Sequence, residues 1–332
     1  MKILVVRFSS IGDIVLTTPV VRALKQQLPG AQVHYCTKPA YRSLIEPNPY
    51  VDKAHYLTGT LTELVAELRQ EQFDFVVDLH NNLRTSILKL RLGVKSASFD
   101  KLNWQKWLLV NAKVDMLPRV HIVERYLAAA APLGVVDDRQ GLDYFIPPDQ
   151  EVDLQTLPGG FQRGYVAFAI GAQHATKRLP TERIIELCAQ LRRPIVLLGG
   201  PEDESTGHIV EEALRNSPTH AFAQAPIYNA CGHYSLNQSA SLVRQAQLVV
   251  SHDTGLMHIA AAFHKEIFSV WGNTVPEFGM YPYRTEFRVL EVRDLPCRPC
   301  SKIGYAKCPQ GHFRCMRDIR FDLGLPPTQD GR

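Results

Sequence analysis

The chain has 332 residues, of which 45% are hydrophobic and 21% are charged, and its formal net charge is +4. This length accommodates two domains with separate cores, and the composition is that of a globular protein. No apolar run approaches the roughly 20 residues of a membrane span, and the small net charge gives no reason to expect nucleic acid as a partner. The sequence begins with a strand rather than a signal-peptide pattern, so we expect a cytoplasmic protein.

The first half of the sequence alternates short apolar strands with helices. The predicted elements are a strand at 3–6, a helix at 14–27, a strand at 32–35, helices at 41–44 and 61–70, a strand at 73–79, and a mostly helical basic region that ends near 133. Strands rich in Val and Ile that alternate with helices are typical of a parallel sheet with helical crossovers.

Residues 137–164 interrupt this pattern with Asp-Asp, Pro-Pro and Pro-Gly-Gly, a composition typical of a linker. The pattern then resumes with strands at 165–170, 195–198, 248–251 and 267–270 and helices at 181–191, 208–215, 235–246 and 256–263. We therefore predict two Rossmann-like, doubly wound α/β domains, residues 1–150 and 151–332, which face each other across a ligand cleft.

The segment Arg7-Phe8-Ser9-Ser10-Ile11-Gly12-Asp13-Ile14 joins the first strand to the first helix. Its small residues allow backbone N–H groups and hydroxyls to meet an anion at a helix N-terminus. Asp13 places a carboxylate where the substrate is expected. Since an acid that faces a phosphate binds it poorly, Asp13 is a better candidate for proton transfer than for binding.

Four predicted strands of the second half are followed by residues suited to a nucleotide, in loops 171–177, 199–204, 251–258 and 271–274. The turn Asp253-Thr254-Gly255 opens a helix, so its N–H groups and the helix dipole suit a diphosphate. The alternative is an ordinary N-cap by Asp253 or Thr254. Lys177 offers a point charge to leaving phosphates, and its alternative is a surface lysine.

Several common motifs are absent from the sequence. It contains neither Gly-x-x-x-x-Gly-Lys-Ser/Thr nor Gly-x-Gly-x-x-Gly, which argues against a P-loop NTPase and weakens a dehydrogenase interpretation. It also lacks a Gly-x-Ser-x-Gly elbow and an Asp-x-Asp pair. A sugar-nucleotide enzyme without that pair would stabilise the departing diphosphate with dipoles and a lysine rather than with a metal.

Residues 80–120 contain eight Lys and Arg residues but two acids, together with Trp104 and Trp107. This combination suits an anionic or amphiphilic partner, such as a phosphorylated lipid head group or a membrane surface. The alternative is a solvated helical face.

Four of the seven cysteines lie close together near the C-terminus, in the pattern Cys297-x2-Cys300-x7-Cys308-x6-Cys315. The spacing is not that of a common zinc finger, and three prolines make the segment loop-like. Zinc or a similar metal, reduced structural thiols and a disulfide are the three alternatives.

The stretches Ser9-Ser10-Ile11-Gly12-Asp13-Ile14-Val15-Leu16-Thr17-Thr18-Pro19 and Ser251-His252-Asp253-Thr254-Gly255-Leu256-Met257-His258-Ile259-Ala260-Ala261 together resemble the ADP-heptose:lipopolysaccharide heptosyltransferases of glycosyltransferase family 9. The resemblance spans nearly the whole chain and implies the GT-B fold. It implies inverting transfer of heptose from ADP-heptose to the inner core of lipopolysaccharide, with an acceptor of the Kdo-lipid A type. It also implies peripheral contact with the inner membrane and no cofactor for catalysis. The cysteines, which occur in only part of the family, keep a structural zinc as an option from their spacing alone.

By this resemblance, Asp13 matches the catalytic base and Lys177 the lysine beside the donor phosphates. The predicted donor-binding residues are Ser10, Gly12, Thr176, Glu204, Tyr234, Asp253, Thr254, Gly255 and His258. The predicted acceptor-binding residues, which share positive charge, are Arg84, Lys89 and Arg91.

Three other functions remain as alternatives. The first is a GT-B glycosyltransferase that uses a different sugar nucleotide or acceptor. The second is a non-catalytic protein that binds a nucleotide or glycan, although Asp13 and Lys177 argue against it because binding alone needs no base. The third is a metal-dependent interaction module built on the cysteines.

Overall fold

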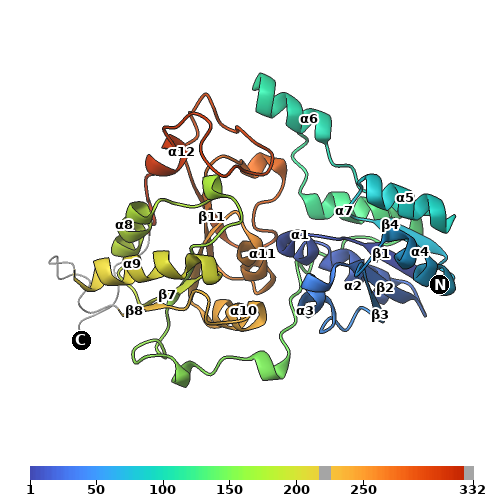
Figure 1. The fold of residues 1–332 in the computed structure, drawn as a ribbon, viewed down its shortest axis with the longest axis horizontal. Coiled ribbons are helices and arrows are strands. Elements are labelled where there is room, and N and C mark those ends of the chain that lie inside the picture. The colour runs from blue at the N-terminus through green and yellow to red at the C-terminus, as the bar shows by residue number, and fades with distance from the viewer. Residues whose placement is uncertain (217–225, 325–332) are drawn as a thin grey trace. The chain divides into compact units, whose positions relative to one another are not determined.

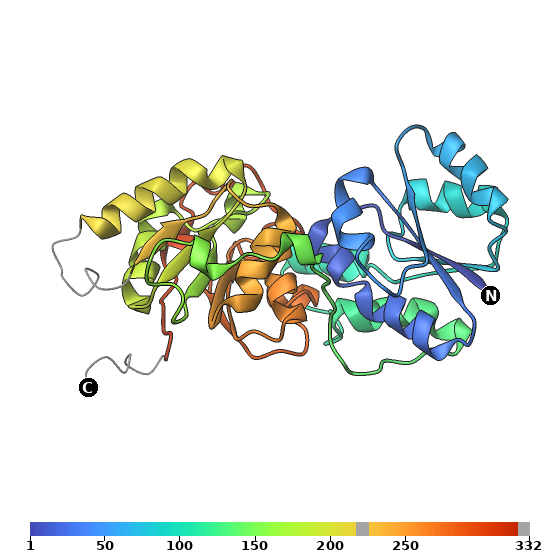
Figure 2. The ribbon, with the colours of Figure 1, turned by 90° about the horizontal axis from the view of Figure 1, so that it is seen from below.

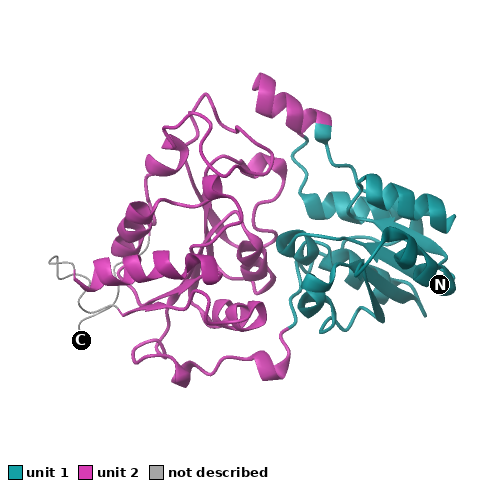
Figure 3. Cartoon of the chain, viewed as in Figure 1, with its two compact units in different colours: residues 1–103, 118–145 teal, residues 104–117, 146–332 magenta. Residues whose placement is uncertain are grey.

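The computed structural model describes residues 1–216 and 226–324, and the chain divides into two compact units (Figures 1 and 3). The first unit consists of residues 1–103 and 118–145, and the second consists of residues 104–117 and 146–332. The second unit therefore starts five residues before the predicted start at 151. The prediction differs more at residues 104–117, which were assigned to the N-terminal domain but contact the second unit.

The first unit is a parallel five-stranded sheet in the order β3-β2-β1-β4-β5. Its strands are β1 (Lys2–Val6), β2 (Gln32–Thr37), β3 (Lys53–Tyr56), β4 (Phe75–Asp78) and β5 (Ser96–Ser98). Its helices are α1 (Ile11–Val15), α2 (Thr18–Gln27), α3 (Arg42–Ile45), α4 (Leu61–Gln70), α5 (Leu83–Leu92) and α7 (Ile122–Ala130). Alternate residues of β1 supply the core: Leu4 and Val6 pack with Leu64 and Leu68 of α4. The helix pairs α4–α5 and α2–α7 cover the sheet (Figure 2).

The second unit is a parallel six-stranded sheet in the order β11-β10-β9-β6-β7-β8. Its strands are β6 (Val166–Ala169), β7 (Ile195–Leu198), β8 (Ile227–Asn229), β9 (Leu248–His252), β10 (Ile267–Trp271) and β11 (Phe287–Glu291). Its helices are α6 (Asn103–Trp107), α8 (Thr181–Leu191), α9 (Glu204–Arg215), α10 (Leu236–Gln245), α11 (Gly255–Ala262) and α12 (Arg314–Arg317). The core extends to the C-terminal segment, where Cys315, Met316, Ile319 and Leu323 are buried with β6 and α8.

The prediction of one helix over residues 14–27 is wrong, because α1 ends at Val15 and α2 begins at Thr18. The Thr17 hydroxyl donates to Ile14 O (2.7 Å), and the Thr18 hydroxyl donates to Val15 O (2.7 Å). Pro19 has no N–H group with which to continue the helical pattern. The break lets α1 hold Asp13 in a short, separate turn.

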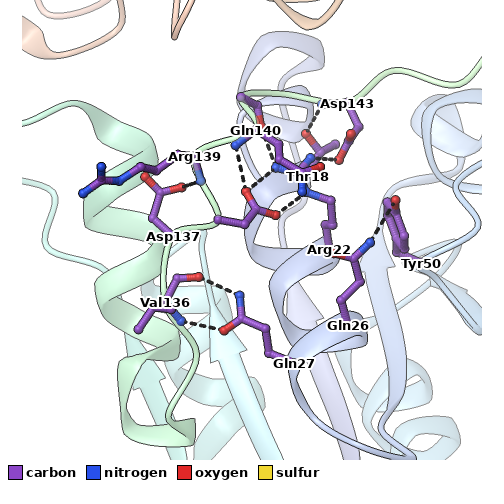
Figure 4. Close-up of polar contacts among 12 residues, drawn as sticks. Thr18, Arg22, Gln26, Gln27, Tyr50, Val136, Asp137, Arg139, Gln140 and Asp143 are labelled. Atoms are coloured by element: carbon purple, nitrogen blue, oxygen red, sulfur yellow. Dashed lines mark hydrogen bonds and ion pairs between the residues drawn. The ribbon is translucent and has the colours of Figure 1, made fainter.

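The end of the first unit is fastened to α2 by Arg22, whose side chain is 1% exposed (Figure 4). Its guanidinium donates to both carboxylate oxygens of Asp138 (2.6 and 2.8 Å) and forms an ion pair with Asp143. The Gln27 side chain also exchanges two hydrogen bonds with the Val136 backbone (2.8 and 2.9 Å). The first residues of the predicted linker are therefore part of the folded unit.

Candidate active site

Asp13 lies in α1, directly after β1 and its following loop. Its Oδ2 atom accepts hydrogen bonds from the Ser10 N–H (3.1 Å) and the Ser10 hydroxyl (2.9 Å), and forms an ion pair with Arg7 Nη2 (2.6 Å). All three contacts end on one oxygen, and Oδ1 has no hydrogen bond from any residue that the structure describes. Asp13 therefore keeps one carboxylate oxygen for a proton.

Arg7 fixes this carboxylate and is not among the predicted site residues. Its guanidinium also donates to Ser9 O (2.6 Å) and Leu79 O (2.5 Å). Burial alone would raise the pKa of Asp13, but the Arg7 charge and the Ser10 hydrogen bonds outweigh burial and lower that pKa. Asp13 is therefore ionised at neutral pH. The available sequence signal was an arginine at the end of a buried strand, where charged residues are rare unless paired.

Ser10 and Gly12, two of the predicted donor-binding residues, belong to the same turn. Ser10 uses both its N–H and its hydroxyl on Asp13, so these groups are not directed at an external anion. Gly12 is buried within α1. Their assignment to donor binding stays a prediction.

In the second unit, Lys177, Asp253 and Thr274 form one connected set. Lys177 Nζ lies 2.6 Å from Asp253 Oδ2, and the Thr274 hydroxyl donates to the same oxygen (2.9 Å). These residues follow β6, β9 and β10, whose carboxyl ends meet at one edge of the parallel sheet. The prediction that the loops at this edge converge is confirmed for Lys177 and Asp253; Thr274 was in a predicted loop but had no role.

The N-terminus of α11 lies directly after Asp253. Thr254 occupies the N-cap position, but its hydroxyl lies 3.3 Å from Ser251 Oγ and makes no capping hydrogen bond. The Asp253 carboxylate is engaged by Lys177 and Thr274. Neither residue therefore acts as the ordinary N-cap that was the alternative. Uncapped N–H groups at a helix start are an anion-binding arrangement.

The loop that carries Lys177 is held at both ends. Thr176, a predicted donor-binding residue, is 2% exposed and forms a reciprocal pair of hydrogen bonds with the Tyr305 backbone. After the loop, the Leu179 N–H donates to His252 Nε2 (3.0 Å). Burial lowers the pKa of His252 to about 4, so at neutral pH the imidazole is uncharged and accepts this bond.

Three further predicted donor-binding residues surround this edge of the second sheet. Glu204 begins α9, and its Oε1 lies 3.6 Å from His233 Nε2, next to Tyr234. The Tyr234 hydroxyl lies 3.5 Å from the Tyr228 hydroxyl, and burial raises the pKa of Tyr234. His258 is buried on α11. The loops after β7 and β8 thus lie together, as a ribose and adenine site would require.

The three predicted acceptor-binding residues on α5 have different environments. Lys89 points inward, with Nζ 2.8 Å from the fully buried Asp78 carboxylate. Arg91 donates to the Thr62 hydroxyl (2.8 Å). Arg84 is exposed and has no ion pair within the described part of the chain. An internal ion pair accounts for Lys89, so Arg84 and Arg91 are the better candidates to meet an acidic acceptor.

The predicted aromatic and basic segment forms an exposed helical projection. The rings of Trp104 and Trp107 stack with centroids 5.3 Å apart, and these residues are 65% and 47% exposed. Lys113, at the end of a π-helical turn, donates to Pro299 O (2.7 Å) in the cysteine segment. Across the described residues, no helix combines the length and apolar character needed to cross a membrane.

All seven cysteines, each within the described residues, are free thiols, which rules out the disulfide alternative. Cys297 Sγ lies 3.8 Å from His312 Nε2, so His312 joins the cluster that sequence spacing identified. Burial first, and the neighbouring thiols second, raise the pKa of Cys300. The cysteines do not form a compact ligand set, however. Over residues 1–216 and 226–324, the set with three ligand atoms within 4.8 Å is His34, His55 and Glu71.

The cluster of His34, His55 and Glu71 lies in the first unit, and nearby lysines already offset the negative charge of its carboxylate. Lys2 and Lys53 both form ion pairs with Glu71, and His34 Nδ1 lies 3.0 Å from His55 Nε2. Two lysine charges at the only carboxylate of the set oppose a divalent cation. It is therefore better explained as a buried hydrogen-bond network than as a metal site.

A cavity of about 370 Å³ lies where α8 and α9 begin. It is lined in part by Ala175, Arg178, Asp203 and Arg317, and it includes none of Lys177, Asp253 and Thr274. Arg178 and Asp203 form an ion pair across it (3.0 Å). The cavity therefore adjoins the lysine loop without being its anion site.

Comparisons with a family model and with curated proteins give consistent matches. A model of glycosyltransferase family 9 (heptosyltransferase) matches residues 61–308. Lipopolysaccharide heptosyltransferase 2 of Escherichia coli K12 is 26% identical, over 96% of this chain and 95% of the relative. Lipooligosaccharide heptosyltransferase 2 of Haemophilus influenzae is 25% identical, over 98% and 97%.

Solved structures show the same fold. The ADP-heptose lipopolysaccharide heptosyltransferase II of E. coli superposes with a TM-score of 0.67 and 24% identity, covering 96% of this chain and 98% of the other. A family 9 glycosyl transferase from Veillonella parvula gives a TM-score of 0.68 and 24% identity, covering 88% and 86%. The two Rossmann-like units are those of the GT-B fold, and this chain belongs to glycosyltransferase family 9, the heptosyltransferases.

Proposed function

We propose that this protein transfers a heptose from ADP-heptose to a sugar of the lipopolysaccharide inner core, with inversion at the anomeric carbon. The observation that carries the proposal is the Lys177–Asp253–Thr274 set beside the uncapped start of α11. A fixed ammonium group and free helix N–H groups suit a diphosphate. Family membership and full-length similarity to lipopolysaccharide heptosyltransferases support heptose and the inner core as the two substrates.

The proposed reaction divides between the two units. The acceptor hydroxyl oxygen forms a bond to the anomeric carbon as the bond from that carbon to the β-phosphate oxygen breaks. Asp13 Oδ1 takes the hydroxyl proton, and Lys177 with the α11 N–H groups stabilises the negative charge that develops on ADP. The products are the heptosylated acceptor and ADP, and Asp13 then releases its proton to water.

Acceptor-dependent release of ADP tests this function. We expect release from ADP-heptose with Kdo-lipid A or heptosyl-Kdo-lipid A, and little release from UDP-glucose with either acceptor. Turnover of UDP-glucose would favour a different sugar nucleotide, and turnover with another glycan would favour a different acceptor. Tight binding of ADP-heptose without turnover on any acceptor would favour the non-catalytic alternative.

We also propose that the Trp104–Trp107 projection makes peripheral contact with the inner membrane, where the lipid A part of the acceptor resides. Stacked, exposed indole rings beside lysines suit the interface of an anionic bilayer. A variant with Trp104→Ser and Trp107→Ser should lose sedimentation with phosphatidylglycerol vesicles. A variant with Ile209→Ser, an exposed apolar residue on α9, serves as the control. Equal sedimentation of both variants would contradict the contact.

We infer that no metal takes part in the chemistry, because Lys177 and the α11 N–H groups supply the positive charge that a metal would. Turnover should therefore be unchanged in EDTA without added Mg²⁺. The thiols of Cys297, Cys300, Cys308 and Cys315 do not converge on one point, so a structural zinc there would require the segment to rearrange. Elemental analysis of the purified protein tests this alternative: one metal per chain that Cys300→Ser and Cys308→Ser together abolish would support it, and a metal-free wild type would leave the cysteines as reduced structural thiols.

A further inference from the structure

The cysteine segment, defined here as residues 297–315, contacts two loops of the candidate active site. On one side, the Cys300 N–H donates to Asn273 O (3.2 Å), in the turn that carries Thr274. On the other side, the Tyr305 N–H donates to the Thr176 hydroxyl (2.8 Å), next to Lys177. The segment is therefore joined to both the lysine loop and the loop after β10.

Arg298 makes most of the contacts to the loop after β10. Its side chain is 3% exposed, Nε donates to Gly272 O (2.6 Å), and Nη2 donates to Thr274 O (2.9 Å). Its other contacts anchor it to the end of β11, through an ion pair with Glu291 (2.6 Å) and a hydrogen bond to Val292 O (2.9 Å). A single guanidinium thus ties the 272–274 turn to the neighbouring strand.

The two loops and the segment are packed without spare space. A Cβ atom at Gly272 would lie 2.8 Å from Thr176 O, so the turn after β10 touches the lysine loop directly. A Cβ atom at Gly304 would lie 2.5 Å from His174 Cβ, on the other side of that loop. A displacement of the turn would consequently be passed to the residues around Lys177.

We propose that Arg298 is a positioning residue for the diphosphate site. By holding both carbonyl groups of the turn, it fixes the Thr274 hydroxyl on Asp253 Oδ2, and Asp253 in turn orients the Lys177 ammonium group. Arg298 acts through Thr274 and does not touch the substrate. The identity of the ligand as a nucleoside diphosphate rests on the proposed function, whereas the coupling of Arg298 to Thr274 rests on these contacts.

The chemistry of the contacts requires an arginine. Four acceptors in fixed directions surround the side chain: three backbone carbonyls and one carboxylate. The planar guanidinium presents five N–H donors in a rigid fork, whereas lysine offers a single flexible ammonium group. Arg298→Lys therefore keeps the charge opposite Glu291 but cannot hold both turn carbonyls.

Arg293 provides a matched control, because it forms an ion pair with the same carboxylate. Its Nε lies 3.0 Å from Glu291 Oε1, yet the Arg293 side chain is 80% exposed and has no contact with the 272–274 turn. Arg293→Lys therefore changes the same residue type at the same partner without touching the turn.

The test measures ADP binding by calorimetry and the kinetics of donor turnover for wild type, Arg298→Lys and Arg293→Lys. We expect the Kd for ADP and the KM for the donor to rise about tenfold in Arg298→Lys, with the acceptor KM and the Arg293→Lys values within twofold of wild type. A purely structural role would lower the melting temperature and the active fraction but leave the Kd of the folded protein unchanged, and that result would overturn the proposal.

A double-mutant cycle with Thr274→Val tests whether Arg298 affects ADP binding through the Thr274 hydroxyl. If Arg298 acts through the Thr274 hydroxyl, adding Arg298→Lys to Thr274→Val should raise the Kd less than twofold further. If the effects of the two substitutions on the binding free energy of ADP were fully additive, Arg298 would not act through Thr274. Should Arg298→Lys fail to fold, Glu291→Gln loosens the same anchor, and an unchanged ADP Kd in that variant would overturn the proposal. A wild type that does not bind ADP would instead overturn the proposed function and the ligand assigned here.

Discussion

The two clusters of candidate site residues, one in each unit, are built in different ways. In the first unit, Arg7, Ser10 and Asp13 lie within seven consecutive residues, and their contacts are made by one loop and one short helix. In the second unit, Lys177, Asp253, Thr274 and Arg298 span more than a hundred residues and meet only because parallel strands end at one edge. A local site can be identified from a motif, whereas an assembled site depends on the fold.

The largest expected effect tests the local site. Asp13→Asn removes the proton acceptor but keeps its size, so kcat should fall by at least about two orders of magnitude, with the ADP Kd within twofold of wild type. Asp52→Asn, which alters a surface carboxylate paired with Lys25, is the control and should leave kcat unchanged. If Asp13→Asn turned over at the wild-type rate, Asp13 would not be the base.

The next effect tests the assembled site. Lys177→Met removes the charge that Asp253 orients, so the Kd for ADP should rise about 10- to 100-fold because a charge-assisted contact to phosphate is lost. Lys302→Met, at an exposed position, should leave ADP binding unchanged. Calorimetry with ADP provides the measurement. Unchanged binding in Lys177→Met would show that Lys177 is not part of the diphosphate site. It would also contradict the assignment of proton transfer to the first unit and donor binding to the second.

The next prediction tests how Arg7 controls the pKa of Asp13 in the local site. Burial raises the pKa of Asp13, and the Arg7 charge is the main influence that lowers it. In Arg7→Met only burial and the Ser10 hydrogen bonds remain, so the Asp13 pKa should rise. The acid limb of the kcat/KM profile should move to higher pH with it. An acid limb that stays in place would mean that another group controls it.

The smallest expected effect concerns stability in the first unit, away from Asp13. Burial, followed by the charge of His55, lowers the pKa of His34 from 6.5 to about 4. Between these values the unfolded chain binds more protons than the folded chain. Stability therefore falls as the pH decreases through this window, by about 3 kcal/mol in total.

Thermal melts at pH 7 and pH 5 test the contribution of His34. His34→Gln should show a smaller loss of melting temperature between these pH values than wild type. His208→Gln, which alters an exposed histidine on α9, should show the wild-type loss. An unchanged pH dependence in His34→Gln would assign the acid sensitivity to other groups, such as the equally shifted His80 and His252.

The sequence predicted the strands that carry continuous apolar runs, including β1, β7 and β9, because burial on both faces imposes that composition. It did not predict β3, β5, β8 or β11. β3 and β5 have the polar sequences Lys-Ala-His-Tyr and Ser-Ala-Ser, and β8 has three residues. These strands lie at or near the sheet edges, where pairing with a neighbour rather than hydrophobic pattern determines the conformation.

The sequence likewise pointed to some residues of the candidate site and not to others. Asp13, Lys177 and Asp253 follow strands that the apolar pattern revealed, and their motifs are specific to the family. Arg7 and Thr274 had no motif, and Arg298 lies among cysteines that drew attention to metal binding. Their importance depends on which oxygen atoms they reach, and that information exists only in three dimensions.

The buried C-terminal segment determines how short a usable fragment can be. The matched family model ends at residue 308, but Cys315, Met316, Ile319 and Leu323 fill the core under β6 and α8. Expression of residues 1–308 would expose that apolar surface and favour aggregation. A truncation intended to aid crystallisation should therefore keep the chain through Leu323.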